Sequence, residues 1–543
     1  MAPHSGRNPY FGRMKWRFVL WMMLAAVPAA AQTEEAVKAA LYLTGAASAE
    51  ELDDRLLEEL DALQGRPLPV NRASRARLLE SGLLTPYQVA ALEEYRSVSG
   101  DILSFAELEL VDGFGKETVA ALRPFLSLDS ARLPGEAVRD TLVFRHSAVL
   151  RATQKDVGGK YRLAAGRFEG AGAWRGESGT FYALWRTRHG KIQVGDYNVR
   201  YGQGLAFWSA FQLSGLSTLD AFSKRGNGIT PSWSFGGAGT LRGAAWDGTF
   251  GPVQAALFGA LDGTIGAHAG WLGRYGQAGL TTTQERLSLE GKYGFRGVDF
   301  FGEAAWKYGK TVSGLGGILF PLGDRFRGAL QLRGIPSAYS GRKYGEYAAA
   351  TGLRYRSDDR NVTASWTLDA ALLPIPQKDP HRMQIKTVGS VSWTFAERWL
   401  WEPRVNVRWR NYDAARADIR SDLSWTSGPW TVKNRINALA SGGWGWLTYV
   451  EAGWKPPGGS AWLRAILFRT PSWQTRIYCY EHDAPGNFTV PALYGTGFSV
   501  SAFGGWKKRW KRLNLKLYLR GSYLLKTDKP GQAGLKVQLM ADY

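Results

Sequence analysis

The chain has 543 residues and a formal net charge of +21, from 68 Lys and Arg against 47 Asp and Glu. Its mean hydropathy is −0.25, and beyond the first thirty-odd residues no apolar run approaches the roughly 20 residues of a transmembrane helix. The single cysteine, Cys479, excludes an intrachain disulfide and a cysteine metal cluster, and we expect it to be a small packing residue. The aromatic content of 13% is typical of a membrane β-barrel, where Trp and Tyr line both lipid–water interfaces.

The first segment has the features of an export signal. Lys15 and Arg17 precede an apolar run, which is followed by a small-residue cleavage site ending at Ala31. We therefore predict a signal peptide over residues 1–31, with Met14 as an alternative start. The apolar run is too short to span a bilayer, so we expect the protein to leave the cytoplasm, which excludes most nucleotide-dependent cytoplasmic chemistry.

The next segment predicts helices. Leucines such as Leu52, Leu56 and Leu60 recur at helical spacing among carboxylates. We divide the segment into a helical lead-in over residues 34–65 and a compact domain over residues 66–130. From residue 34 to residue 130 there are 9 Lys and Arg against 18 Asp and Glu, a net charge of −9.

After this acidic segment the pattern changes to period two, and we predict a β-barrel over residues 137–543. Apolar and polar residues alternate in stretches such as 362–370, 404–410 and 513–520. A soluble sandwich with one wet face shows the same alternation. The barrel is favoured because the pattern recurs over some 400 residues without an intervening helix, and because the polar face carries Arg and Lys. The predicted fold class is α plus all-β: a small helical domain, then an antiparallel transmembrane β-barrel of about 18–22 strands.

The end of the chain supports an outer-membrane location. Its last nine residues, 535–543, alternate up to the terminal aromatic Tyr543, and this resembles the C-terminal strand by which outer-membrane proteins are recognised for assembly. The resemblance implies the outer membrane of a Gram-negative bacterium, with outer-membrane lipid and the assembly machinery as partners and the helical domain in the periplasm. Alternation also predicts that Arg404, Arg408, Arg410, Lys516, Arg520 and Lys536 face the lumen, while Val405, Trp409, Leu515 and Leu519 face lipid.

The basic charge belongs to the barrel. Outside the leader and the acidic segment there are 55 Lys and Arg against 29 Asp and Glu, a net charge of +26. One interpretation is that strand-end and loop cations neutralise lipid phosphates. The other is a lumen that attracts a polyanion, and the sequence leaves both open.

The domain over residues 66–130 carries the clearest motif. Its features are an Asn after Pro-Val at Asn71, a Tyr-Arg pair ahead of Gly100, and a Gly-Phe-Gly turn that begins at Gly113. In this order they resemble a tandem helix-hairpin-helix domain of the competence-protein (ComEA-like) type, over roughly sixty residues. In DNA-binding members, backbone N–H groups at the hairpin glycines capture a phosphate without reading sequence. The candidate DNA-phosphate residues here are Gly113, Phe114, Gly115 and Lys116 in the second hairpin and Gly82 in the first.

Two observations count against DNA binding. The first hairpin, around Gly82, lacks the second glycine and the following lysine. Residues 66–128 hold 7 basic and 8 acidic side chains, so the domain has no electrostatic footprint for nucleic acid. The alternative is a packing module that kept the fold and lost the ligand.

The whole layout also resembles a bacterial outer-membrane family in which this domain precedes a barrel and which has no settled activity. In the barrel the likeness is carried by residues 194–205 and by a second stretch made of residues 478–483 and 490–497. The motif residues are Gly195, Asp196, Tyr197, Arg200, Gly202, Gln203, Gly204, Glu481, Gly495 and Gly497. Their glycines indicate close backbone approach or kinks where strands curve. The irregular segment 207–239 is expected to cap or enter the lumen.

Enzymatic chemistry finds little support. The histidines of the mature chain do not recur at metal-ligand spacing, and we expect no metal, no cofactor and no catalytic residues. Glu481, His482 and Asp483 place two carboxylates beside an imidazole, but neighbours on a strand point to opposite faces. No strained nucleophile turn is evident, although a triad assembled from distant strands would leave no such local pattern.

Two functions remain. The first is a channel or transport component for DNA or another polyanion, with the helical domain as a periplasmic docking site. The second is a non-transporting outer-membrane scaffold, whose helical domain binds a periplasmic protein or plugs the barrel. The basic barrel and the hairpin motif favour the first function, and the acidic helical domain favours the second.

Overall fold

The computed structural model describes residues 33–52, 54–65, 67–129, 144–209, 215–235, 239–273 and 275–543. The predicted signal peptide, residues 1–31, lies outside these ranges. Within them no helix is long and apolar enough to cross a bilayer.

Short helices make up the N-terminal part of the described chain, residues 33–129. They are α2 (Thr33–Thr44), η1 (Ala49–Glu51), α3 (Asp54–Gly65), α4 (Arg75–Glu80), α5 (Pro86–Ser99), α6 (Phe105–Leu108), α7 (Gly115–Leu122) and η2 (Arg123–Phe125), with a two-stranded parallel pair of β1 (Leu68–Pro69) and β2 (Leu126–Ser127). We call this unit the helical domain. One core of alanines, leucines and valines, from Ala36 to Leu126, runs through all of it.

Local hydrogen bonds explain where these helices begin and how they are joined. Thr85 and Gln88 form a reciprocal capping box at the start of α5, which satisfies backbone N–H groups that would otherwise lack a partner. The Gln88 side chain then donates to the Gly113 carbonyl at 2.7 Å and links the start of α5 to the turn before α7. The buried amide of Asn71 exchanges hydrogen bonds of 2.9 Å with the backbone of Ile102.

Strands make up the rest of the chain. In the first half they are β3 (Phe144–Thr153), β4 (Val157–Ala165), β5 (Phe168–Arg175), β6 (Ser178–Arg186), β7 (Gly190–Arg200), β8 (Gly228–Pro231), β9 (Leu241–Phe250), β10 (Val253–Ala260), β11 (Ile265–Gly273), β12 (Gly276–Thr283), β13 (Arg286–Phe295), β14 (Val298–Lys307) and β15 (Thr311–Leu322). In the second half they are β16 (Phe326–Ile335), β17 (Glu346–Arg356), β18 (Val362–Leu372), β19 (Met383–Phe395), β20 (Trp399–Arg410), β21 (Asp413–Ser427), β22 (Trp430–Ser441), β23 (Trp444–Trp454), β24 (Gly459–Thr470), β25 (Ile477–Tyr478), β26 (Ala492–Leu493), β27 (Gly495–Trp510), β28 (Leu513–Lys526) and β29 (Lys529–Asp542). Short helices η3 (Leu219–Ala221) and α8 (Ser337–Ser340) lie in loops between strands.

These strands close into one antiparallel barrel, because the C-terminal strand β29 pairs with the first barrel strand β3. Among the described residues 24 strands form the ring; β8 pairs beside β7, and β25 and β26 form a separate pair. The predicted number of barrel strands, about 18–22, was too low. Several strands, such as β5, β10 and β12, have only 8 residues and are followed by tight turns. Because such strands are short and rich in glycine, two consecutive strands are easily counted as one in the sequence.

The two faces of the barrel are reversed relative to a soluble protein. Outward side chains such as Trp271, Leu289 and Val405 are exposed, whereas inward charged side chains such as Glu303 and Arg435 are buried. A closed ring satisfies every backbone group, so an apolar exterior of this kind suits lipid. The fold is that of an outer-membrane β-barrel.

The prediction of which side chains face the lumen is confirmed. Arg404, Lys516 and Arg520 are buried inside the barrel, while Val405 and Trp409 are exposed on its outer face. Because side chains alternate along a strand, a one-residue error in register would have exchanged these two groups.

The ends of the barrel differ in their loops. At the end where β3 begins and β29 ends, the strands are joined by short turns; one is the two-residue turn at Arg296 and Gly297, both with positive φ. The opposite end carries the long connections, residues 201–240, 336–345, 373–382 and 471–494.

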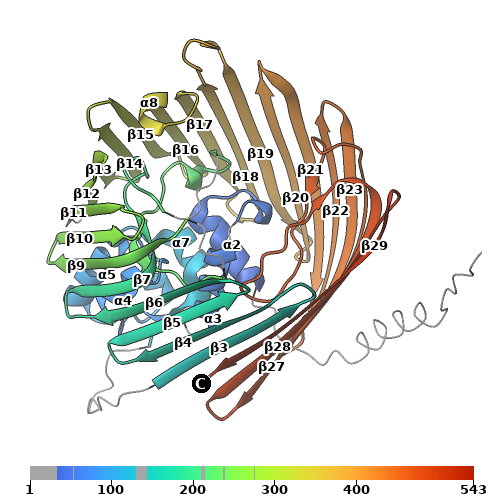
Figure 1. Cartoon of the computed structure of the whole chain (residues 1–543), viewed down its shortest axis with the longest axis horizontal. Helices are drawn as coiled ribbons and strands as arrows, with labels where there is room; N and C mark the ends of the chain where they lie inside the picture. The colour runs from blue at the N-terminus through green and yellow to red at the C-terminus, as the bar shows by residue number, and fades with distance from the viewer. Residues whose placement is uncertain are drawn as a thin grey trace, which may run out of the picture.

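The helical domain lies inside the ring of strands (Figure 1), where α2, α3 and α7 are surrounded by the barrel wall. The long segments 201–240 and 471–494, here called inner loop 1 and inner loop 2, contact it from the side of the long loops. Thr218 of inner loop 1 donates to the Gly45 carbonyl at 2.8 Å, and Phe488 of inner loop 2 packs against the helical core. The expectation that the irregular segment enters the lumen is therefore confirmed for its described residues.

Candidate functional site

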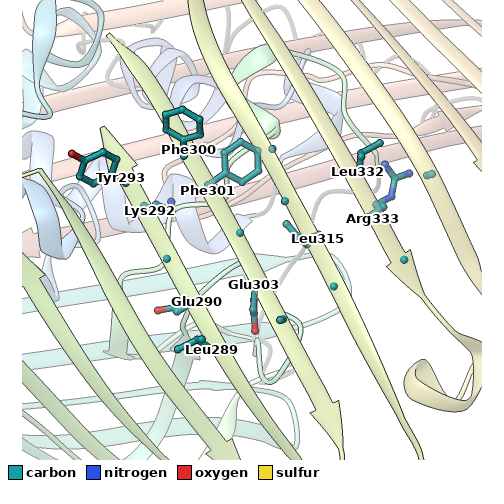
Figure 2. A pocket seen from close by; sticks show the side chains of 18 of the residues that line it. Leu289, Glu290, Lys292, Tyr293, Phe300, Phe301, Glu303, Leu315, Leu332 and Arg333 are labelled. Atoms are coloured by element: carbon teal, nitrogen blue, oxygen red, sulfur yellow. The ribbon is translucent and has the colours of Figure 1, made fainter. Parts of the chain in front are cut away.

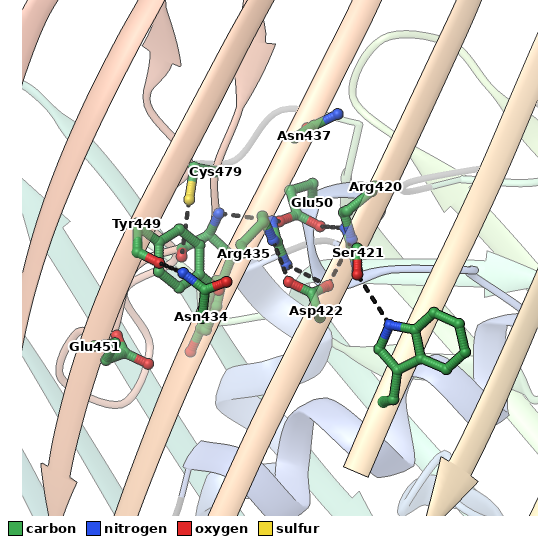
Figure 3. Close-up of polar contacts among 12 residues, drawn as sticks. Glu50, Arg420, Ser421, Asp422, Asn434, Arg435, Asn437, Tyr449, Glu451 and Cys479 are labelled. Atoms are coloured by element: carbon green, nitrogen blue, oxygen red, sulfur yellow. Dashed lines mark hydrogen bonds and ion pairs between the residues drawn. The ribbon is translucent and has the colours of Figure 1, made fainter.

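The contact between the helical domain and the barrel centres on Glu50, in the turn between α2 and α3. Its carboxylate lies 2.7 Å from Arg435 of β22 and 3.1 Å from Arg420 of β21. It also accepts the backbone N–H of Tyr480 in inner loop 2 at 3.2 Å. Figure 3 shows this carboxylate between the two arginines, with Asp422 on their other side. One acidic side chain thus joins three parts of the molecule.

The charge state of Glu50 follows from these neighbours. Burial alone would raise the pKa of this carboxyl, but the guanidinium groups of Arg435 and Arg420 outweigh burial and hold the pKa well below its usual range. Glu50 is therefore ionised at neutral pH. Its arginines keep a second partner, because Asp422 lies 2.7 Å from Arg420 and 2.5 Å from Arg435.

Two further carboxylates of the helical domain pair with the wall. Glu51 lies 2.7 Å from Arg404 of β20. Glu117, in the first turn of α7, lies 3.1 Å from Arg354 and 2.7 Å from Arg356 of β17. The acidic helical domain and the basic barrel, whose opposite charges are evident in the sequence, thus meet in complementary ion pairs.

Inner loop 2 contains the second barrel motif and is fixed to three strands. Glu481 pairs with Arg520 of β28, His482 lies 3.2 Å from Glu451 of β23, and Asp483 lies 2.6 Å from Lys536 of β29. The expectation that these three residues belong to a strand was wrong, because only Glu481 makes an isolated bridge, to Thr489. Prolines on either side of the segment interrupt regular pairing.

Cys479 lies beside this motif and is fully buried. It packs in a cluster with Leu447, Ile466 and Phe468 of the barrel, as expected of a packing residue. Burial raises the pKa of its thiol to about 11, so the thiolate is scarce at neutral pH. Two motif glycines lie at the end of this loop: Gly495 opens β27 with φ +92°, and a Cβ on Gly497 would lie 2.3 Å from the Leu525 carbonyl oxygen.

The first barrel motif lies on β7. Gly195 has φ +106°, and a Cβ there would lie 2.2 Å from the Phe181 carbonyl oxygen. Pairing between β6 and β7 ends at this glycine, and β7 continues against β8 and β9. Beyond it Asp196 pairs with Arg242 at 3.0 Å, and the Tyr197 hydroxyl donates to the Gly259 carbonyl at 2.7 Å. The motif therefore builds the point where inner loop 1 leaves the wall.

The start of inner loop 1 wraps around a buried carboxylate of the wall. Glu303 of β14 accepts the backbone N–H groups of Gln203 at 2.6 Å, Leu205 at 3.1 Å and Ala206 at 3.0 Å. Gly202 is required by the close approach: its φ is +63°, and a Cβ would lie 2.1 Å from Glu290 Oε2. The glycine-rich sequence thus forms an anion-binding turn that the protein's own carboxylate fills.

A basic cavity of about 800 Å³ lies between inner loop 1, the helical domain and the wall from β13 to β21; we call it the basic chamber. Its lining includes Arg200 and Gly204 of the first barrel motif, as well as Gly82 of the helical domain. Among the described residues that line it, eleven are Lys or Arg and three are Asp or Glu: Arg200, Lys224, Arg225, Arg286, Arg333, Arg342, Arg382, Lys386, Arg408, Arg410 and Arg416, against Asp220, Glu346 and Asp369. The predicted lumen cations Arg408 and Arg410 belong to this set.

Apart from Gly82, the candidate phosphate residues, which lie around Gly113, are not among the residues that line the chamber. Phe114 is the N-cap of α7 and is buried in the helical core. Gly113 has φ +81°, with Tyr87 where its side chain would be, while Gly115 has φ +68° and open space beside it. Lys116 is exposed.

A large apolar groove of about 1620 Å³ lies on the barrel wall from β11 to β19. Leu289, Tyr293, Phe300 and Leu332, labelled in Figure 2, are among its exposed lining residues. Outward glycines and alanines between them hollow the surface. Since this face belongs to the apolar exterior, acyl chains of the bilayer can fill the groove.

Sequence reasoning missed the residues that dock the helical domain. Glu50 and Glu51 looked like ordinary carboxylates of a solvated helix, and only their place at a break between two helices set them apart. No group of three or more His, Cys, Asp or Glu side chains in the described part of the chain is placed to hold a metal ion.

The closed ring, apolar exterior and charged, occupied interior define a transmembrane β-barrel of the outer-membrane type. No family model matches the sequence, and no curated protein matches it. Among solved structures, the P pilus usher PapC translocation pore is similar with a TM-score of 0.35 and 10% identity, over 74% of this chain and 98% of that chain. The copper transporter OprC gives a TM-score of 0.39 at 9% identity, over 74% and 80%. Pseudomonas aeruginosa OprD gives 0.31 at 9%, over 75% and 97%.

Proposed function

We propose that the protein is an outer-membrane channel whose helical domain is a plug, so that transport requires its release. The observation that carries this proposal is the buried Glu50 carboxylate, held between Arg420 and Arg435 at the middle of their strands. A charge buried in this way stays in place only while it is paired. The contact therefore holds the helical domain in the barrel while it is formed. Once it is broken, the unpaired buried charge destabilises the docked position of the domain.

We further propose that the plug enters from the periplasm. Short turns are typical of the periplasmic end of outer-membrane barrels and long loops of the extracellular end. Here the short turns share an end with both termini of the barrel. Glu117 contacts Arg354 and Arg356, where β17 approaches that same end, so a periplasmic protein could reach the plug there. Outer-membrane lipid and the assembly machinery are the other partners that we propose.

The transported molecule is proposed to be a polyanion, either DNA or another. Support comes from the basic chamber, whose lining cations outnumber its carboxylates by eight. A lumen of this charge raises the local concentration of anions. A phosphate contact at Gly113, Gly115 and Lys116 of a ComEA-like hairpin would add DNA as a ligand of the plug. Because the helical domain is acidic, we expect that contact to be weak, and Gly115→Asp should remove it.

The second candidate function is a non-transporting scaffold with a permanently filled barrel. It is favoured by the number of contacts that fix inner loop 2, including the pairs of Glu481 with Arg520 and of Asp483 with Lys536. These contacts hold inner loop 2 against the barrel wall without involving the helical domain. In that case, release of the plug would not open a path.

Planar-bilayer conductance of the full chain distinguishes the plugged channel from the non-transporting scaffold. The variant Glu50→Gln/Glu51→Gln/Glu117→Gln removes the three docking carboxylates. The control Glu35→Gln/Glu94→Gln/Asp112→Asn removes three carboxylates of the same domain that form no ion pair with the described barrel residues. We expect frequent large openings from the docking variant and closed behaviour from the control and the wild type. A docking variant that assembles into heat-modifiable barrels and never conducts would favour the scaffold.

A further inference from the structure

The basic chamber lies at the end of the barrel with the long loops. Tyr344 comes from the loop between β16 and β17, Arg382 from the loop before β19, and Tyr412 from the turn between β20 and β21. Arg342 at its rim is 60% exposed. Leu43 and Thr44 of the helical domain form part of its floor. A molecule in the chamber would thus contact the wall, inner loop 1 and the plug together.

The three carboxylates of the chamber are already used. Glu346 and Asp369 both pair with Arg333, at 2.5 Å and 2.9 Å, and Asp220 pairs with Arg354. Among the described residues of the lining, seven cations have no carboxylate at ion-pair distance: Lys224, Arg225, Arg286, Arg382, Lys386, Arg408 and Arg416. This uncompensated charge points to an anionic ligand.

Buried polar atoms of the lining give a second, independent indication. The Nε atoms of Arg286, Arg382 and Arg408 are buried and have no hydrogen-bond partner among the described residues, and the same holds for Asn227 Oδ1. Buried polar groups are normally paired. A ligand with several acceptors and a few donors would satisfy them.

The form of the chamber argues against both a small anion and a nucleic acid. A cavity of about 800 Å³ is in the range of sites for larger organic ligands, and a single small anion would neutralise one of many cations. Sites for single-stranded nucleic acid present aromatic faces on which bases stack. Here the rings are covered by the chamber's own cations, with Arg382 3.6 Å from the centre of Tyr412 and Arg286 4.9 Å from that of Tyr339.

We propose that the basic chamber binds an acidic oligosaccharide at the outer side of the barrel. Nine of its eleven cations are arginines, whose planar fork suits carboxylate and related oxyanions. Amides such as Asn227 and Asn406 in the lining suit sugar hydroxyls. This oligosaccharide would be the ligand of the proposed channel. Only the route by which it reaches the chamber rests on the proposed function.

Calorimetric titration of the full detergent-solubilised chain tests it, with oligogalacturonate as the probe. The controls are a neutral maltooligosaccharide of equal length and a single-stranded oligonucleotide of equal charge. We expect oligogalacturonate to bind, the neutral sugar not to bind, and the oligonucleotide to bind more weakly. Tighter binding of the oligonucleotide, or binding of the neutral sugar, would overturn the proposed ligand class.

Substitutions of the chamber's cations test whether oligogalacturonate binds in the basic chamber. Arg382→Gln/Arg408→Gln/Arg416→Gln should weaken oligogalacturonate binding by more than about tenfold, since each charge-assisted contact is worth roughly that factor. The control Lys507→Gln/Lys508→Gln/Arg509→Gln removes the same charge at the other end of the barrel and should change affinity less than about twofold. Equal loss in both variants would show that binding follows net charge and would overturn the site.

Arg382→Lys separates a folding defect from a loss of recognition, because it keeps the charge and removes the fork. We expect an intermediate affinity from an assembled barrel, and wild-type affinity would contradict recognition by the arginine fork. Binding and conductance are measured separately. A channel that opens when the plug is released but does not bind oligogalacturonate refutes the ligand, whereas binding without any conductance refutes the channel.

Discussion

Replacing Glu50 by Gln tests how the helical domain is held in the barrel. The substitution preserves size and leaves one acceptor for the Tyr480 N–H, but it removes the charge that faces Arg420 and Arg435. Breaking one side of a buried ion pair costs about 3–5 kcal/mol. Because Asp422 still pairs with both arginines, we expect the lower value. About 3 kcal/mol corresponds to a roughly 150-fold shift in the docking equilibrium.

The assay is the open fraction of single channels in planar bilayers, with Glu35→Gln as the matched control. Glu35 lies on α2 of the same domain and its only ion pair, among those the structure describes, is with Lys38 on that helix. We expect a large rise in open fraction for Glu50→Gln and none for Glu35→Gln. Equal open fractions in two assembled, heat-modifiable variants would refute the role assigned to Glu50.

The same contact has a defined pH dependence. The pKa of Glu50 is lowered in the folded protein, so its stabilisation is complete above the ordinary carboxyl value of about 4.3. It is lost only as the pH falls through the lowered folded value. We therefore expect the proposed channel to stay closed in the wild type between about pH 7 and pH 5. Opening within that range would mean that another group controls the plug.

The remaining predictions concern the wall and the inner loops. Cys479, buried with its pKa raised to about 11, should react with maleimide only slowly at pH 7 and rapidly after denaturation; fast labelling of the native barrel would contradict its burial. Ile436→Arg, on the outer face near the middle of β22, should cost roughly 2–4 kcal/mol and impair assembly, measured by heat-modifiability, whereas Lys433→Gln on the inner face should be tolerated. Glu303→Gln weakens three backbone contacts of inner loop 1, each worth about 1.5–3 kcal/mol. Limited proteolysis should then cut that loop faster than in the exposed control Glu285→Gln, and equal rates would contradict the anchor.

Local patterns in the sequence were sufficient for the type of fold and for the faces of its strands. Side chains alternate with a period of two whatever the strand's neighbours are, so Arg404 and Lys516 could be placed inside and Val405 outside. The helical spacing of leucines predicted the helices for the same reason. The opposite net charges of the helical domain and the barrel follow from composition alone.

Only the tertiary structure decided how these parts meet. The number of strands depends on where the ring closes, and β29 pairs with β3 across nearly the whole barrel sequence. Glu50 and Arg435 are 385 positions apart, so no local spacing could join them. The segment around Glu481 has the composition of a strand, yet it folds inward because Arg520 and Lys536 satisfy its carboxylates. Periodicity is a property of neighbours along the chain, whereas docking depends on which charges the closed ring brings together.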